Sequence, residues 1–154
     1  MERAAIQTLV EELFAALGTK IDEVRVSEGA RTVVSVASPD KATLIGPNGE
    51  HLRAINHVAR RLAEGRSKGE DASFTIDVGD YLEGQLETIR ANARMLAQRA
   101  RLFKHEVEMP PMSSYERLVI HELFAEDPEI QTESAGEGKF RHIVLKYNGG
   151  QQKE

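Results

Sequence analysis

The sequence has no cysteine and no tryptophan, and its aromatic residues are limited to 5 phenylalanines and 3 tyrosines. Without cysteine, the chain can form neither a disulfide scaffold nor a zinc site with thiolate ligands. No apolar run approaches the roughly 20 residues that a membrane-spanning helix needs. Hydrophobic residues make up 40% and charged residues 29% of the 154 residues, which is typical of a globular chain. The sequence therefore predicts a cytoplasmic globular protein with an aliphatic core and no membrane segment.

The charge balance is acidic, with 20 Lys and Arg against 25 Asp and Glu and a net charge of −5. This balance argues against a protein that coats nucleic acid indiscriminately. Two stretches are nevertheless locally basic: residues 53–66 hold several arginines against the single acid Glu64, and residues 90–105 hold no acid. Charge alone favours two solvated helix faces, and the alternative is two pieces of an anion-binding surface.

Hydrophobic periodicity predicts an α+β domain over residues 1–79. Apolar residues recur at helical spacing over residues 5–17, and residues 24–36 alternate as a β-hairpin. Residues 74–78 alternate as a third strand. Between the hairpin and this strand, the pattern predicts two helices separated by a turn.

The two helices have separate signals. Ser38-Pro39 predicts the start of a short helix, with Ser38 as the N-cap and Pro39 in the first helical position. The longer helix is expected to start after Gly49. Its predicted buried stripe consists of Leu52, Ile55, Val58 or Ala59, and Leu62.

The second half predicts a smaller α+β domain over residues 80–147, followed by a flexible polar tail at 148–154. Residues 80–83 resemble a capping box that opens a long helix to about Phe103, and residues 113–116 resemble another that opens a shorter helix. Residues 130–134 and 142–147 are predicted strands. The residues expected to face inward on the long helix are Leu82, Leu86, Ile89, Ala93, Leu96 and Ala100.

The segment Leu44-Ile45-Gly46-Pro47-Asn48-Gly49 forms a Gly-x-x-Gly turn between the two predicted helices. Such a turn lets a sugar-phosphate strand lie against the start of the second helix, where N–H groups and the helix dipole favour phosphate. The alternative is that the glycines only turn the chain. The order of helix, hairpin, helix, turn, helix and strand is similar to that of a type II KH domain.

Arg117 and His121 form a second candidate site, because residues four apart share one face of a helix. An arginine side chain can bind phosphate with its planar guanidinium group, and it can stack on bases. Lys139, Arg141 and His142 follow in the last predicted hairpin. From spacing alone, an ordinary surface arginine and a partly packed histidine remain the simpler interpretation.

Three segments together resemble a known family: residues 74–81, residues 111–117 running into His121, and residues 133–138. In this order they resemble the Jag family of bacterial proteins, also called KhpB or EloR, which joins a KH domain to an R3H domain. The resemblance covers about residues 4–147. It implies a non-enzymatic, cytoplasmic protein that binds single-stranded RNA, with single-stranded DNA as a further ligand. It also implies post-transcriptional control linked to cell elongation and division.

By position, the resemblance implies RNA contacts at Gly46, Pro47, Asn48, Gly49, Arg117, His121 and Arg141. Pro47 and Asn48 stand where the family usually has one or two basic residues, and proline also lacks an N–H group. We therefore expect weaker phosphate binding at this turn, supported by Lys41, Arg53 and Arg60. Since aromatic residues are few, backbone and base-edge contacts should dominate over stacking.

Two other functions compete with RNA binding by both domains. In the first, the KH-like domain is a protein-interaction or dimerisation scaffold and only the R3H domain binds nucleic acid. The partner would be a small single-KH protein, KhpA, as the resemblance implies, or a second copy of this chain. The other is an enzyme, which the sequence disfavours because it has no cysteine, His-Glu-x-x-His motif or Walker loop. We therefore expect no cofactor and no metal.

Overall fold

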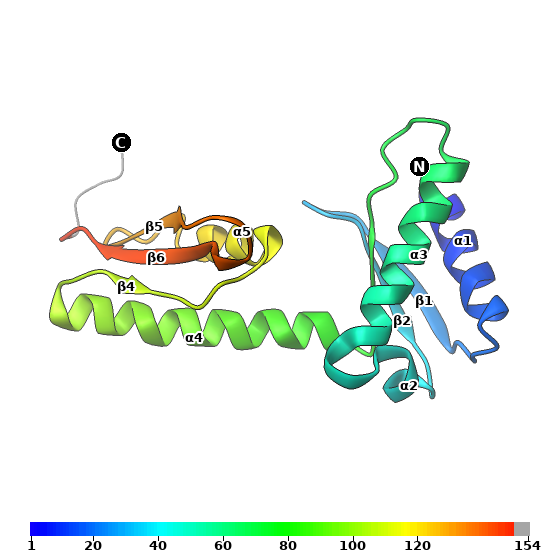
Figure 1. The fold of residues 1–154 in the computed structure, drawn as a ribbon, viewed down its shortest axis with the longest axis horizontal. Coiled ribbons are helices and arrows are strands. Elements are labelled where there is room, and N and C mark those ends of the chain that lie inside the picture. The colour runs from blue at the N-terminus through cyan, green and yellow to red at the C-terminus, as the bar shows by residue number, and fades with distance from the viewer. Residues whose placement is uncertain (150–154) are drawn as a thin grey trace. The chain divides into compact units, whose positions relative to one another are not determined.

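The computed structural model describes residues 1–149, which form two compact units. The first unit comprises Met1–Glu83, and the second begins at Gly84 (Figure 1). Each unit combines helices with a three-stranded sheet, so the protein is of the mixed α+β class. No helix in residues 1–149 has both the length and the apolar character needed to cross a membrane.

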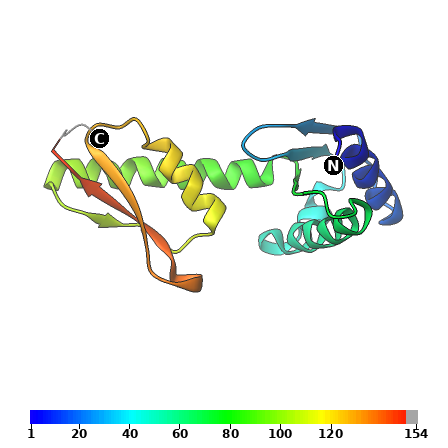
Figure 2. The ribbon, with the colours of Figure 1, turned by 90° about the horizontal axis from the view of Figure 1, so that it is seen from above.

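The first unit follows the predicted element order. Its elements are α1 (Arg3–Ala16), β1 (Glu23–Ser27), β2 (Val33–Ala37), α2 (Lys41–Ile45), the 3-10 turn η1 (Pro47–Gly49), α3 (Glu50–Arg66) and β3 (Thr75–Val78). Strand β1 pairs antiparallel with β2, and β2 pairs parallel with β3. Helices α1 and α3 cover one face of this sheet (Figure 2), where Val26, Val34 and Ile76 are buried.

The buried stripe of α3 differs in part from the prediction. Leu52 and Ala59 are buried as expected, whereas Val58 is 45% and Leu62 38% exposed. Buried Ala63 takes the inward position instead, because small side chains let α3 lie close to α1 and the sheet. Asn56 also faces the sheet, and its amide bonds both the N–H and the carbonyl of Ile76 in β3.

Both predicted caps of the first unit are reassigned by the structure. The Ser38 hydroxyl donates to the Lys20 carbonyl at 2.5 Å, and α2 begins only at Lys41. Ser38 is therefore not the N-cap of α2. At the start of the long helix, the buried Asp77 carboxylate accepts the N–H groups of Leu82 and Glu83 at 2.9 and 3.2 Å.

Asp80, which the sequence marked as the N-cap of that long helix, has φ +57°. An N-cap residue is typically extended, so Asp80 lacks the backbone conformation of a capping residue. The bonds from the buried carboxylate of Asp77 satisfy two first-turn N–H groups that would otherwise have no partner.

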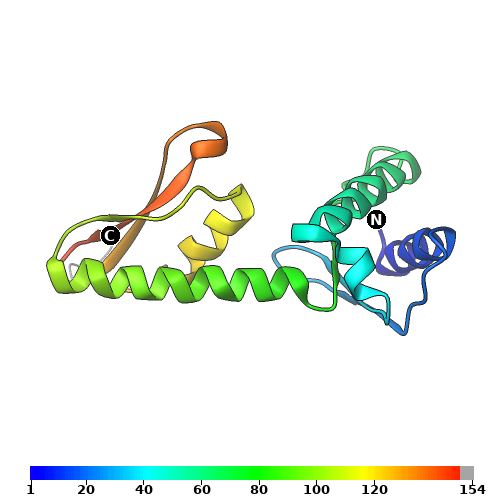
Figure 3. The same cartoon turned by 60° about the horizontal axis from the view of Figure 1, so that its bottom comes forward.

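The second unit is built on α4 (Tyr81–Phe103), which begins in the first unit and ends where the sequence predicted. The remaining elements are β4 (Val107–Glu108), α5 (Ser114–Leu123), β5 (Ile130–Ala135), the 3-10 turn η2 (Gly138–Phe140) and β6 (His142–Tyr147). Strand β6 lies between β4 and β5, and both pairings are antiparallel. The hairpin of β5 and β6 extends away from α4, with η2 at its tip (Figure 3).

Three alanines of α4 line the core of the second unit: Ala93, Ala97 and Ala100 pack with buried residues of α5 and the sheet. The capping box at α5 is confirmed, because Ser113 Oγ accepts the Glu116 N–H and Glu116 Oε2 accepts the Ser113 N–H. At the end of the sheet, the Asn148 N–H donates to the Glu129 carbonyl at 3.0 Å. The rest of the predicted tail, residues 150–154, lies outside the described residues.

Candidate nucleic-acid interface

The turn formed by residues 46–49 requires both of its glycines. Gly46, Asn48 and Gly49 have φ values of +70°, +52° and +74°, in the left-handed region that favours glycine and tolerates asparagine. A Cβ on Gly46 would lie 2.4 Å from His51 Cγ, and one on Gly49 would lie 2.8 Å from Tyr81 Cε1. The glycines therefore serve the local packing of the chain, whatever else the turn does.

Most N–H groups of the 46–49 turn are bonded within it or to the preceding helix. The Gly46 N–H donates to the Ala42 carbonyl at 3.0 Å, and the Gly49 N–H donates to the Gly46 carbonyl at 3.3 Å. The Glu50 N–H donates to the carbonyl of Pro47, which itself has no N–H. The turn therefore offers a phosphate fewer donors than its sequence suggested.

The three cations expected to support this turn have different surroundings. Arg53 Nη1 donates to the Asn48 carbonyl at 2.9 Å, so this guanidinium braces the turn. The methylene groups of Lys41 lie against Gly79, where a Cβ would come within 3.1 Å of Lys41 Cδ. Arg60 lines a separate pocket of about 290 Å³.

The pocket of Arg60 contains a second arginine that the sequence analysis missed, Arg31 in the turn between β1 and β2. Its lining consists of Arg31, Thr32, Arg60, Ser73, Phe74 and Thr75. The parallel pairing of β2 with β3 brings Val33 opposite Thr75, and thus brings the hairpin turn next to the segment before β3. The sequence could indicate Arg31 only together with the knowledge that β2 and β3 are parallel neighbours.

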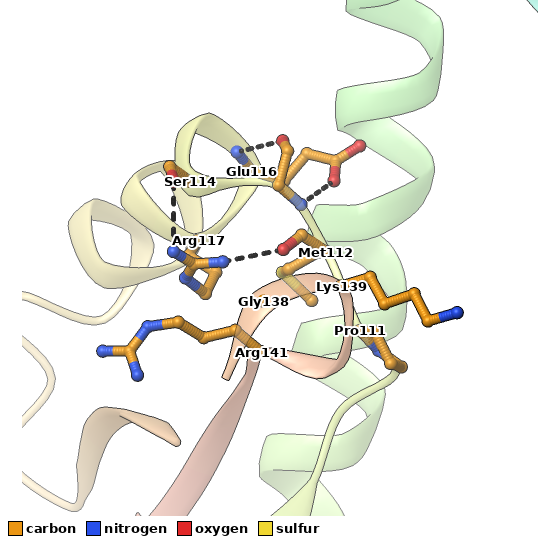
Figure 4. Close-up of a pocket in the computed structure, with 9 residues that line it drawn as sticks. Pro111, Met112, Ser114, Glu116, Arg117, Gly138, Lys139 and Arg141 are labelled. Carbon is orange, nitrogen blue, oxygen red and sulfur yellow. Dashed lines mark hydrogen bonds between the residues drawn. The ribbon is translucent and has the colours of Figure 1, made fainter. Parts of the chain in front are cut away.

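Three basic residues of the second unit line one cavity. Arg117 of α5, Lys139 of η2 and Arg141, which follows η2, line a cavity of about 590 Å³, here called the Arg117 pocket (Figure 4). The guanidinium groups of Arg117 and Arg141 lie on one side of the η2 turn, and the Lys139 ammonium points to the other side (Figure 4). The rest of the lining is Pro111, Met112, Ser113, Ser114, Glu116 and Gly138.

Hydrogen bonds to uncharged groups hold both arginines of the Arg117 pocket. Arg117 donates to the Met112 carbonyl at 2.8 Å and to Ser114 Oγ at 3.1 Å, and Arg141 donates to the Gly136 carbonyl at 2.8 Å. Within residues 1–149, neither guanidinium forms an ion pair with a carboxylate. The pocket therefore presents two oriented guanidinium groups, while the one acid in its lining, Glu116, directs its Oε2 to the Ser113 N–H.

The basic stretch of residues 90–105 is different, because acids outside it neutralise much of its charge. Arg90 and Arg94 pair with Glu87 at 3.3 and 3.2 Å, and the pairing lowers the pKa of the Glu87 carboxyl. Arg101 pairs with Asp127 and also with Glu129, the latter at 3.4 Å. These ion pairs favour the expected solvated helix face over the alternative of an anion-binding surface.

His121 lies on the inner side of α5. Its Nδ1 is 2.6 Å from Thr132 Oγ1, and its Nε2 is 3.1 Å from Ser134 Oγ, so both ring nitrogens bond strand β5. Burial, and secondarily the charge of Arg117, lower the pKa of His121. The ring therefore favours its neutral form, and His121 is not among the residues that line the Arg117 pocket. Its geometry suits a residue that positions α5 against the sheet.

Comparison with known proteins identifies the second unit and the family. The family model of the R3H domain matches residues 86–147. A Clostridium symbiosum protein named RNA-binding protein KhpB is 29% identical over 147 residues, covering 94% of this chain and 65% of that protein. The RNA-binding protein KhpB of Bacillus subtilis is 33% identical over 145 residues, covering 92% of this chain and 67% of that protein.

The protein of the same name from Streptococcus pneumoniae is 25% identical over 147 residues, and the match covers 44% of its length. The chain thus spans about two thirds of the Clostridium and Bacillus relatives and less than half of the Streptococcus relative. Because the match to the Bacillus protein extends over nearly the whole chain and an R3H domain forms the second half, the chain belongs to the KhpB (Jag) family.

Proposed function

We propose that this protein is a non-enzymatic binder of single-stranded RNA, with the Arg117 pocket as its principal contact to the sugar-phosphate backbone. The observation that carries the proposal is the pair of guanidinium groups, Arg117 and Arg141, in one open cavity without a carboxylate partner among residues 1–149. A planar guanidinium binds phosphate with two parallel hydrogen bonds. The relatives are named RNA-binding proteins, and the proposal extends that property to this chain.

We propose that the first unit is a type II KH-like domain that adds weaker contacts to the same RNA. Its support is the element order, with a Gly-x-x-Gly turn between α2 and α3 and a parallel pairing of β2 with β3. The contacts would come from the 46–49 turn with Lys41 and Arg53, and from Arg60 with Arg31. The family resemblance extends the proposal to cytoplasmic post-transcriptional control linked to cell elongation and division.

The test is fluorescence anisotropy of a labelled single-stranded RNA, titrated with protein across a salt series. Affinity should fall linearly on logarithmic axes, by about 0.7 log units per log unit of salt for each phosphate neutralised. Competition with single-stranded DNA shows whether binding depends on the ribose, and competition with duplex RNA shows whether binding requires an unpaired strand. The absence of salt-dependent binding to any single-stranded RNA would contradict the proposal.

A second candidate function is that the first unit binds a protein rather than RNA. The observation favouring it is that the N–H groups of Gly46 and Gly49 are already bonded to backbone carbonyls and that the 46–49 turn carries no charged side chain. The partner would be a single-KH protein such as KhpA, or a second copy of this chain. Light scattering after size exclusion tests the homodimer: an RNA-independent dimer that Asn48→Arg dissociates supports it, and a monomer refutes it.

A further inference from the structure

Phe140 is an exposed aromatic side chain beside the Arg117 pocket. It is the last residue of η2, between Lys139 and Arg141, and its side chain is 65% exposed. Exposing a large apolar ring to water is unfavourable. The chain has only 5 phenylalanines, and this one is placed in η2, at the tip of the β5–β6 hairpin (Figure 3). An exposed ring at this place suits a ligand that covers it.

The backbone around Phe140 is fixed on both sides. The Phe140 N–H donates to the Glu137 carbonyl at 3.2 Å, and the Phe140 carbonyl accepts a hydrogen bond from His142 Nδ1 at 2.9 Å. Arg141 is held in turn, because its N–H donates to the Gly138 carbonyl at 3.2 Å. These bonds fix the backbone from which the ring and the neighbouring guanidinium project, and a preordered backbone lowers the entropy cost of binding.

One face of the Phe140 ring has a partner within the protein. Lys139 Nζ lies 5.2 Å from the ring centroid, within the range of a cation–π contact. Most of the ring area nonetheless remains exposed. A planar group can therefore stack on the remaining face while the adjacent Arg141 contacts an anion.

We infer that Phe140 is a stacking platform for an unpaired nucleobase whose flanking phosphate lies in the Arg117 pocket. This inference rests on the proposed function and names the part of the nucleotide that this position recognises. A nucleobase offers the flat π-face that Phe140 needs, and a base in a duplex cannot reach it without leaving its stack. The platform therefore selects single-stranded over paired RNA and tolerates any base. It also adds one stacking contact to a protein whose composition predicted mainly backbone and edge contacts.

Phe103 provides a matched control within the same unit. Its side chain is 62% exposed, close to the value for Phe140, but it ends α4 and is not next in sequence to any residue of the Arg117 pocket. Its ring already stacks on His105, with centroids 5.9 Å apart and planes at 12°. Loss of this ring should not change the binding of RNA.

The experiment uses a single-stranded RNA containing 2-aminopurine, a base whose fluorescence is quenched when it stacks. Affinity and quenching are measured for the parent protein and for Phe140→Ala, Phe140→Tyr, Phe103→Ala and Arg117→Ala, with circular dichroism as the check on folding. Phe140→Ala should weaken binding about tenfold and remove the quenching. Phe140→Tyr and Phe103→Ala should match the parent.

The outcomes separate the stacking role from the proposed function. Parent-like affinity and quenching in Phe140→Ala, together with weaker binding by Arg117→Ala, would overturn the stacking role and leave RNA binding intact. An equal loss in Phe103→Ala would also overturn it, because the effect would not be specific to the platform. No salt-dependent binding by the parent would overturn both the stacking role and the proposed function.

Discussion

The chain carries two glycine-containing turns, the 46–49 turn and η2, and the structure gives them different properties. The N–H groups of both glycines in the 46–49 turn are already bonded, to the preceding helix and within the turn, and the turn carries the uncharged Pro47 and Asn48. The η2 turn also bonds backbone groups internally, but Lys139 and the following Arg141 line a pocket with Arg117. A turn motif therefore fixes backbone geometry, whereas the capacity to bind an anion depends on which donors and charges remain available.

This difference predicts that the two units contribute unequally to RNA binding. Phosphate contacts supply much of the affinity of a nucleic-acid-binding protein, and each contact adds salt dependence. We therefore expect the R3H unit to dominate affinity and salt dependence, with the first unit adding less. Substitutions in each unit test this expectation.

The largest effect is expected for Gly46→Ala, which should destabilise the first unit by about 3 kcal/mol. The new Cβ would sit at φ +70° and 2.4 Å from His51 Cγ, so strain and overlap add. Gly18→Ala is the control, because Gly18 has φ +71° but no atom within 4 Å of the added Cβ. Urea unfolding measures the free energy of unfolding of both variants. Equal losses of stability in the two variants would show that the overlap with His51 adds nothing to the cost of the dihedral angle at Gly46.

The next effect concerns the Arg117 pocket. The double change Arg117→Ala, Arg141→Ala should weaken binding to single-stranded RNA at least tenfold and flatten its salt dependence by roughly 1.4 log units per log unit, since two phosphate contacts are lost. Anisotropy across a salt series measures both quantities. Arg94→Ala is the control, because this arginine is already paired with Glu87. A loss of the same size in the control would mean that overall charge, not the pocket, governs binding.

A smaller effect is expected when His121 titrates. Its pKa is lowered in the folded protein from the usual 6.5 by burial and by the charge of Arg117. The unfolded chain therefore binds more protons as pH falls below about 6.5, and the folded state loses stability there. Urea unfolding of the parent at pH 7.5 and 5.0 should show this loss, and His121→Asn should show less of it. If the free energy of unfolding depended on pH equally in the parent and in His121→Asn, the loss of stability would not come from His121.

The smallest effect is expected for Asn48→Asp. Aspartate tolerates the φ of +52° at this position nearly as well as asparagine, and the side chain is exposed. The change places a negative charge on the 46–49 turn without disturbing its glycines. If the turn contributes little, RNA affinity in the anisotropy assay should fall less than about twofold. A tenfold loss would mean that phosphate lies at this turn.

Local sequence signals predicted most elements, because periodicity and capping act over a few residues. The end of α4 at Phe103 and the capping box at Ser113 lie where the sequence placed them. The errors involve contacts that neither periodicity nor the capping-box pattern describes. The carboxylate that caps α4 comes from Asp77, before the turn, and the acid that pairs with Arg101 comes from Asp127.

The candidate site shows the same limit. Spacing placed Arg117 and His121 on one helix, but it could not show that Thr132 and Ser134 engage both nitrogens of the histidine. Nor could it show that Arg141 joins Arg117 in one pocket, since that depends on the hairpin of β5 and β6 meeting α5. The pairing of strands decides which side chains meet, and a single sequence does not state that pairing.

The most direct test of the unequal roles is to map backbone amide chemical shifts while single-stranded RNA is added. The account predicts the largest changes at residues 112–117 and 138–142, and smaller changes at residues 46–50. The largest changes at residues 46–50, with residues 112–117 and 138–142 unaffected, would contradict it.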